Sequence, residues 1–139
     1  MDEKVTVNHA SALLNAFVRP ERRARYLGLL ASAKGRAKLR AQLAHFRDLD
    51  PRFAAPVPGG QGPAAIAALL VDRGAPPVCY VLSEDADLDG REMPLAEGLA
   101  AVVGRGMGTF LSCVPGRLAY FEGEDAGERF VLERRAPVI

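Results

Sequence analysis

The chain of 139 residues is 49% apolar and 25% charged with a formal net charge of +1, which excludes a wholly disordered protein. Its length suits one domain of ordinary size, or one domain with a helical appendage. No apolar run approaches the ~20 residues that a membrane-spanning helix needs, and the first residues lack the pattern of a signal peptide, so we expect a cytoplasmic protein without a membrane partner.

Residues 1–53 have the pattern of three amphipathic helices. Asn8 is a suitable N-cap for the first helix, which ends at Pro20. A second helix begins at Pro20, because proline at the first helical position lacks only an N–H that would stay unpaired. A third helix follows Ser32 and has Leu39 on its apolar face. We therefore predict a basic three-helix unit in this part of the chain.

A segment rich in proline and glycine follows the helices. Residues 54–62 contain Pro56, Pro58 and three glycines, a composition typical of a linker. An alanine-rich helix then begins at Pro63. We predict a helical unit over residues 1–53, a linker over 54–62 and an α/β sheet domain over 63–139.

The last part of the chain predicts a small sheet. Apolar runs at 78–82 and 108–114 are rich in strand formers, and a helix beginning near Pro94 separates them, which is a β-α-β pattern. Two such strands in one sheet are expected to be parallel, with Ser83 and Val114 at the same edge. Two further strands follow, at residues 118–122 and 128–133. The predicted fold class is α+β: the three-helix unit, then a mixed sheet of about four strands in the order β-α-β-β-β with two covering helices.

The two cysteines, Cys79 and Cys113, both lie in the predicted strands. Two cysteines are too few for a disulfide scaffold or for a zinc site with four thiolates. We expect both to be buried, unpaired thiols.

An acidic segment follows the first predicted strand, with five carboxylates in the nine residues 84–92. Its first half matches a calcium-binding loop, but the twelfth position is Ala96 instead of a bidentate glutamate, and a strand precedes it instead of a helix. We expect a solvated acidic loop and no cofactor. The alternative is a Mg²⁺ or Ca²⁺ site formed by Glu84, Asp85, Asp87 and Asp89.

Two arginines are candidates for ligand binding near this loop. Arg91 lies inside it, and Arg117 follows a turn that the parallel arrangement would place at the same edge of the sheet. An arginine beside clustered acids can bind a phosphate or carboxylate ligand, although ion pairing within the protein is the more frequent outcome. We therefore regard Arg91 and Arg117 as candidate ligand-binding residues, and in a metal-dependent hydrolase Arg117 would recognise a phosphate or carboxylate.

The sequence shows no local motif of a catalytic site. His9 and His45 are the only histidines, and a helix-end imidazole held by a carboxylate is the interpretation that we favour for His45. A Ser/His/Asp or Cys/His site assembled in space stays open. The alternating Gly104, Gly106 and Gly108 follow a helix and precede a strand, which favours helix termination and close packing over a phosphate-binding loop.

The charge is divided unevenly along the chain. Residues 1–53 hold 11 Lys or Arg against 5 Asp or Glu, whereas residues 54–139 hold 7 against 12. Such a division indicates a nucleic-acid surface, an acidic partner, or docking of one part of the chain on the other.

From these features we expect a non-catalytic binding or adaptor protein that uses its basic helical face. A protein partner is the leading hypothesis and nucleic acid the second, because few aromatic residues accompany the basic ones; self-association into a homo-oligomer is compatible with both. The competing class is a small divalent-metal-dependent hydrolase acting at the acidic loop. The predicted partner-binding residues are Arg22, Arg25, Arg36, Lys38 and Arg40.

Overall fold

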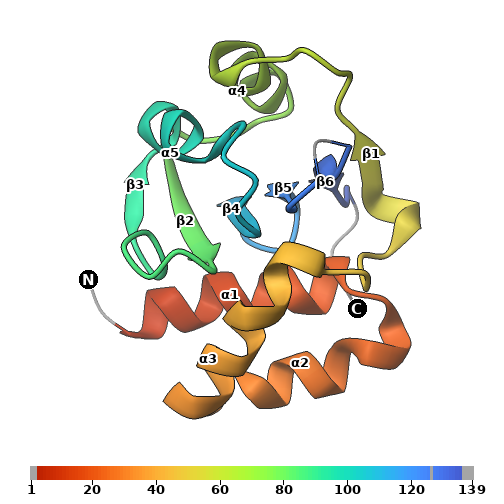
Figure 1. The fold of residues 1–139 in the computed structure, drawn as a ribbon, viewed down its shortest axis with the longest axis vertical. Helices are drawn as coiled ribbons and strands as arrows, with labels where there is room; N and C mark the ends of the chain where they lie inside the picture. The colour runs from red at the N-terminus through yellow and green to blue at the C-terminus, as the bar shows by residue number, and fades with distance from the viewer. Residues whose placement is uncertain (1–2, 126, 136–139) are drawn as a thin grey trace.

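The structure, a computed structural model, describes residues 3–125 and 127–135, and for residues 3–8 it describes the backbone alone. The described residues form a mixed α+β fold in which helices cover both faces of one antiparallel sheet (Figure 1), so the predicted fold class is confirmed. The helices are α1 (Glu3–Phe17), α2 (Arg23–Leu29), α3 (Ala33–Gln42), α4 (Pro63–Asp72) and α5 (Leu95–Val102), with short 3₁₀ helices η1 (Pro20–Arg22), η2 (Leu43–His45) and η3 (Pro51–Phe53).

The sheet has six strands in the order β1-β6-β5-β4-β2-β3, which is more than the four that we predicted. Every pairing is antiparallel. The strands are β1 (Ala54–Pro56), β2 (Val78–Ser83), β3 (Glu92–Pro94), β4 (Thr109–Val114), β5 (Leu118–Glu122) and β6 (Arg129–Glu133).

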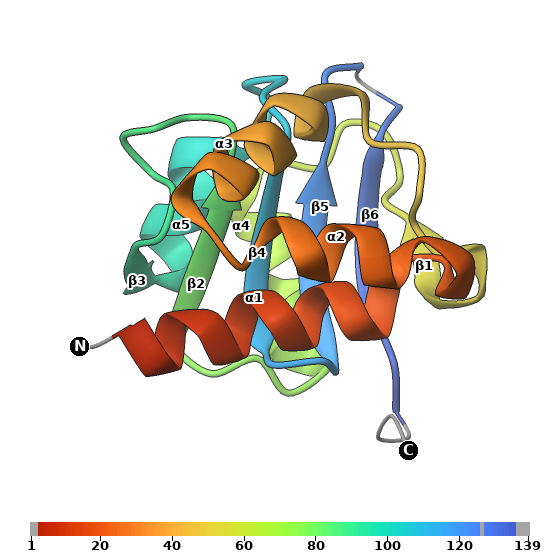
Figure 2. The same ribbon diagram turned by 90° about the horizontal axis from the view of Figure 1, so that it is seen from below.

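The three N-terminal helices form the layer on one face of the sheet, as Figure 2 shows. Phe17 of α1 and Leu39 of α3 are buried in one apolar core with Phe110 and Phe121 of the sheet. This core joins α1, α2 and α3 to the strands. The division of the chain into a helical unit, a linker and a sheet domain stays a prediction.

The sequence signals mark the start of α3 and the start of the 3₁₀ helix η1 that leads into α2, but not the start of α1. Pro20 separates α1 from α2, and the Ser32 hydroxyl caps α3 by accepting a hydrogen bond from the Gly35 N–H at 3.0 Å. The prediction that Asn8 caps α1 is wrong, because the helix begins upstream at Glu3. An asparagine is only mildly unfavourable within a helix, so its position alone does not mark a helix start.

Helices α4 and α5 form the layer on the other face. Ile66 and Leu70 of α4 and Leu99 of α5 are fully buried and pack in a second core with Val81 and Leu111 of the sheet. Because both faces are covered, residues 79–83 of β2 and 109–113 of β4 are all buried, and these runs show no alternation of buried and exposed positions. No helix among the described residues is long and apolar enough to cross a membrane.

Both cysteines lie in this second core as free, buried thiols, which confirms the prediction. Burial raises the pKa of Cys79 to about 11 and that of Cys113 to about 12. The thiolate is the reactive form, so both side chains are poor nucleophiles at neutral pH.

The predicted parallel pairing of the first two long strands is wrong. Strand β3, which the sequence pattern did not indicate, runs back along β2, so that α5 begins at the opposite end of the sheet and leads into an antiparallel β4. Ser83 consequently pairs with Thr109, and Val114 lies at the far end of β4. Only three residues form β3, which is too short for a recognisable alternation of apolar and polar residues.

Part of the predicted linker is a strand. Ala54 to Pro56 form β1, which pairs with β6 at the edge of the sheet, and Val57 continues the contact by donating a hydrogen bond to the Arg129 carbonyl at 2.9 Å. The segment thus crosses from the layer of α1, α2 and α3 to that of α4 and α5 along this edge (Figure 1).

Candidate functional site

The five predicted partner-binding residues do not form one surface. Arg36 and Arg40 of α3 face the acidic loop, Arg22 and Arg25 line a pocket beside α2, and Lys38 is exposed on α3. The two pairs of arginines therefore have different surroundings.

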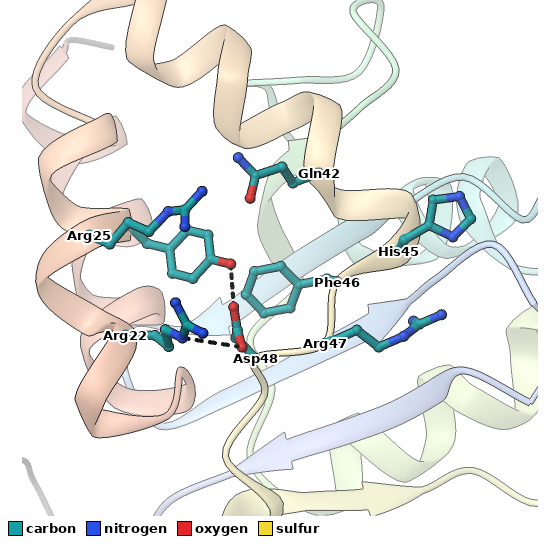
Figure 3. A pocket seen from close by; sticks show the side chains of 8 residues that line it. Arg22, Arg25, Gln42, His45, Phe46, Arg47 and Asp48 are labelled. Atoms are coloured by element: carbon teal, nitrogen blue, oxygen red, sulfur yellow. Dashed lines mark hydrogen bonds and ion pairs between the residues drawn. The ribbon is translucent and has the colours of Figure 1, made fainter.

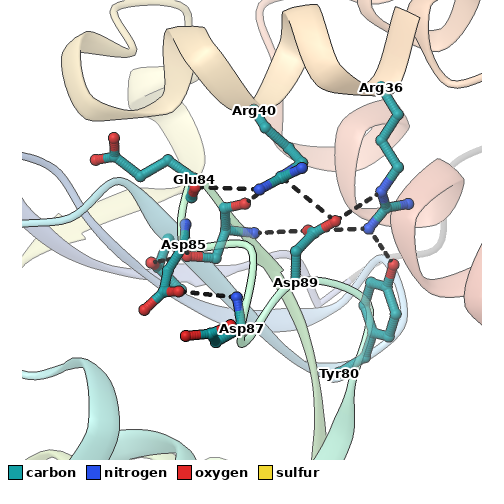
Figure 4. Close-up of polar contacts among 9 residues, drawn as sticks. Arg36, Arg40, Tyr80, Glu84, Asp85, Asp87 and Asp89 are labelled. Atoms are coloured by element: carbon teal, nitrogen blue, oxygen red, sulfur yellow. Dashed lines mark hydrogen bonds and ion pairs between the residues drawn. The ribbon is translucent and has the colours of Figure 1, made fainter. Parts of the chain in front are cut away.

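Arg36 is engaged inside the protein. Its Nε and Nη2 atoms donate hydrogen bonds to the Asp89 carboxylate at 3.0 and 3.1 Å, and Nη2 also donates to the Tyr80 hydroxyl at 2.6 Å (Figure 4). The Arg36 side chain is 22% exposed and that of Asp89 only 11%, so the pair is largely shielded from water. Such a bidentate geometry is the strongest form of arginine-to-carboxylate contact.

Arg40 extends the same contact one turn along α3. Its Nε donates to the Ser83 carbonyl at 2.9 Å and lies 3.6 Å from Asp89, while Nη2 donates to the Glu84 carbonyl at 3.2 Å. The Ser83 N–H in turn donates to Asp89 at 2.9 Å. The basic part of the chain therefore docks on the acidic part at this contact, which is one of the options that the charge division left open. The prediction of a solvated loop is wrong for Asp89.

The other carboxylates of the predicted metal site do not gather around a common centre. Glu84 accepts a hydrogen bond from the Gly108 N–H at 2.7 Å, and Asp85 accepts one from the Asp87 N–H at 2.9 Å. In the described parts of the chain, no group of three or more His, Cys, Asp or Glu side chains is placed to hold a metal ion. The structure thus gives the metal hypothesis of Glu84, Asp85, Asp87 and Asp89 no support.

Arg117 lies far from the acidic loop, contrary to our expectation. Because β4 is antiparallel to β2, the turn that carries Arg117 is at the opposite end of the sheet, and Arg117 lines a cavity of about 250 Å³ with Arg73 and Glu133. Its Nη2 donates to the Arg135 carbonyl at 2.7 Å. Arg91 is in the acidic loop as predicted and is exposed.

The alternating glycines hold a buried carboxylate, a role that the sequence did not reveal. The N–H groups of Gly104 and Gly106 both donate to Glu122 at 3.0 Å, and the Tyr120 hydroxyl donates to it at 2.8 Å. Positive φ angles of 84° and 68° at the two glycines turn these N–H groups toward the carboxylate. Close packing, as predicted, explains Gly108, where a Cβ would lie 2.1 Å from a backbone atom of η2.

The structure also brings His9 and Ser112 together, the kind of pair that the sequence left open. His9 Nδ1 lies 2.9 Å from Ser112 Oγ, and the imidazole stacks on the Tyr80 ring at a centroid distance of 5.3 Å. Ser112 has 0% exposed surface, so no substrate reaches its hydroxyl. The pair is a contact between α1 and the sheet.

The pocket beside α2 exists because two distant segments of the chain meet. Val18, which directly follows α1, forms a β-bridge with Leu49, and the backbone N–H of Arg19 donates to the Asp48 carbonyl at 2.8 Å. These contacts hold the first turns of α2 beside the segment that leaves η2. The resulting cavity of about 300 Å³ is lined by Arg22, Arg25, Tyr26, Gln42, His45, Phe46, Arg47 and Asp48 (Figure 3).

Among the described residues of this lining, Asp48 is the one carboxylate, and it is held by Tyr26. The Tyr26 hydroxyl donates a hydrogen bond to Asp48, and burial together with this bond raises the pKa of Tyr26 to about 12. Tyr26 therefore stays protonated and keeps Asp48 in place. Arg22 Nε lies 4.0 Å from Asp48, which is a long ion pair, and the Arg22 side chain is 51% exposed.

The two sides of the pocket differ in charge. On the η2 side, His45 lies 3.0 Å from Glu124, and Arg47 pairs with Glu128, both from the loop between β5 and β6. A carboxylate does hold the imidazole of His45, as we expected, although it comes from this distant loop. On the α2 side, the excess positive charge of Arg22 and Arg25 faces the cavity (Figure 3).

Sequence reasoning identified Arg22 and Arg25 but missed the other residues around the cavity. The bridge between Val18 and Leu49 brings these residues, Gln42, Phe46 and Arg47 among them, to the cavity. No local sequence pattern predicts a contact between segments so far apart. The arrangement is suited to binding a carboxylate or phosphate, because arginine presents several N–H donors in a fixed geometry. No protein family model, no curated protein and no solved structure matches this chain.

Proposed function

We propose that the protein is a non-catalytic binding or adaptor protein whose pocket beside α2 engages an acidic segment of a protein partner. One observation carries this proposal: Arg22 and Arg25 line a cavity in which, of the residues that the structure describes, Asp48 alone contributes a carboxylate. An acidic segment would supply the negative charge that this side of the pocket lacks.

The exposure of the arginines supports a role for α2 over α3. Arg36 and Arg40 already bind Asp89 and backbone carbonyls, so a partner would have to break these contacts before using them. Arg22 and Arg25 are exposed, and the contact of Arg22 with Asp48 is a long ion pair of 4.0 Å. We therefore restrict the predicted contact surface to the α2 side of the basic unit.

The surroundings of the pocket favour a protein partner over nucleic acid. Glu124 and Glu128 lie at the rim beside His45 and Arg47, where they would repel the continuous phosphate charge of a nucleic acid. Phe46 is buried and offers no open ring face for a base. A short acidic segment can place its carboxylates on the α2 side, away from both glutamates.

Charge reversal tests the proposal. Wild-type protein and the double variant Arg22→Glu/Arg25→Glu would be used as baits for proteins of the native host, and bound proteins would be identified. We expect one or more acidic proteins on the wild type that are absent from the variant, because two arginines on the cavity become repulsive.

The matched control is Arg73→Glu/Arg117→Glu, which reverses two exposed arginines at the opposite end of the sheet. It should retain the partner. If the α2 variant retained the partner, or if both variants lost it equally, the result would contradict a contact that is specific to the pocket. Recovery of nucleic acid in place of protein would also contradict the proposal.

A further inference from the structure

A second, mostly apolar groove lies next to the pocket. It has a volume of about 240 Å³ and is lined by Phe46, Leu49, Pro51, Ala54 and Phe130, together with the paired Arg47 and Glu128. The groove is therefore formed by the segment from η2 to β1 on one side and by β6 on the other.

The groove and the basic pocket are adjacent. Phe46 and Arg47 line both, so that the same turn of chain separates a cationic cavity from an apolar one. Arg47 is tied to Glu128, which leaves Arg22 and Arg25 as the cationic side of the combined surface. A ligand that covers both cavities meets positive charge at one end and apolar side chains at the other.

We propose that the acidic partner segment also carries one large apolar side chain, such as leucine or phenylalanine, which occupies this groove. This inference rests on the proposed function, because it places the acidic part of the segment against Arg22 and Arg25. An apolar cavity of about 150 Å³ holds one benzene molecule, so a groove of about 240 Å³ accommodates a single side chain of this size. The charged pocket orients the segment, and the groove adds affinity through apolar burial.

Peptides that vary the two features separately test this proposal. Each peptide has a glycine-serine background and carries either two acidic residues or the two corresponding amide residues, together with either one leucine or one serine. In each of these four kinds of peptide, the spacing between the pair and the leucine or serine is varied. Their affinities for the full chain would be measured by fluorescence anisotropy. We expect the acidic leucine peptide to bind best at one spacing, and about tenfold better than its serine counterpart, because burial of leucine contributes that much or more.

A substitution that fills the groove identifies the site of this preference. Ala54→Phe places a ring in the groove, whereas Ala55→Phe places the same ring on the opposite face of the same strand, because side chains alternate along β1. The first variant should lose the leucine preference and still bind acidic peptides, and the second should behave like the wild type. Matching thermal unfolding curves would verify that both variants are folded.

The outcomes separate the two proposals. Equal binding of leucine and serine peptides, with binding still lost in Arg22→Gln/Arg25→Gln, overturns the groove and leaves the basic pocket standing. A leucine preference that survives in Ala54→Phe also overturns the groove. Binding of no acidic peptide by the wild type overturns both proposals, and so does tighter binding of a labelled single-stranded oligonucleotide that Ala54→Phe leaves unchanged.

Discussion

The arginines of α3 and those of α2 have the same charge and lie in the same basic third of the chain, yet their surroundings differ. Arg36 binds a carboxylate that is only 11% exposed, and a tyrosine hydroxyl completes its contacts. Arg25 has an exposed side chain beside the Tyr26 ring, with 5.9 Å between the guanidinium carbon and the ring centroid. The first arginine holds two layers of the fold together, and the second faces a cavity.

The difference shows that a count of basic residues does not measure a binding surface. An arginine that is withdrawn from water must be paired, because an unpaired buried charge is costly. Asp89 provides that pairing for α3, so part of the charge division between the two parts of the chain is used inside the fold. On the α2 side, by contrast, Arg22 and Arg25 are exposed.

The largest effect on stability should come from removal of the buried carboxylate of Glu122. It serves as the reference against which the smaller losses at the arginines are compared. We expect Glu122→Ala to lower the free energy of unfolding by about 3 to 5 kcal/mol, because it leaves Arg129 without its carboxylate and two N–H groups without an acceptor. Urea unfolding followed by circular dichroism measures this change. Glu124→Ala, which removes an exposed carboxylate, should cost less than about 1 kcal/mol, and equal losses would contradict the role of burial.

The contact between α3 and the acidic loop should rank second. We expect Arg36→Ala and Asp89→Ala each to cost about 2 to 3 kcal/mol, since the partner left behind is a poorly hydrated charge. The double variant should cost less than the sum of the two, with a coupling energy of about 1 to 2 kcal/mol in urea unfolding. Asp87→Ala, at an exposed position of the same loop, is the control and should be nearly neutral. Simple additivity of Arg36 and Asp89 would show that the ion pair does not form.

The contact of His9 with Ser112 extends the comparison to a group whose hydrogen-bonding partner carries no charge, and it makes the free energy of unfolding depend on pH. Burial lowers the pKa of His9 below its usual 6.5, although the Glu92 carboxylate opposes this shift. The folded protein therefore binds fewer protons at His9 than the unfolded chain, so this histidine makes stability fall as the pH drops below about 6.5. His9→Gln keeps a hydrogen-bonding group without titration and should lose less stability between about pH 7 and about pH 5. An identical pH dependence of urea unfolding in both proteins would exclude this contribution.

The smallest effect on stability is expected on the α2 side. Arg22→Glu/Arg25→Glu should change the free energy of unfolding by no more than about 1 kcal/mol, because exposed charges contribute little to folding. Thermal unfolding of this double variant would be compared with that of Arg36→Glu, which should be clearly destabilised. A large loss of stability in the α2 variant would erase the difference between the two groups of arginines.

The sequence was sufficient for features that depend on neighbouring residues. The helix from Pro63, the helix after Ser32 and the buried cysteines follow from spacing, capping and apolar runs, and the structure confirms them. The division of charge was also visible, including the option that one part of the chain docks on the other. The short strands β1 and β3 were missed because three residues are too few to show a period.

Only the tertiary structure decided which of these features meet. The direction of β4 depends on β3. Because β4 is antiparallel to β2 and not parallel as predicted, Arg117 lies at the opposite end of the sheet from the acidic loop. The pocket beside α2 likewise depends on the bridge between Val18 and Leu49. Local sequence determines how a segment folds, because its hydrogen bonds and apolar spacing lie within a few residues. The pairing of distant segments depends on how whole layers pack, and here that packing left Arg22 and Arg25 exposed and Arg36 and Arg40 engaged.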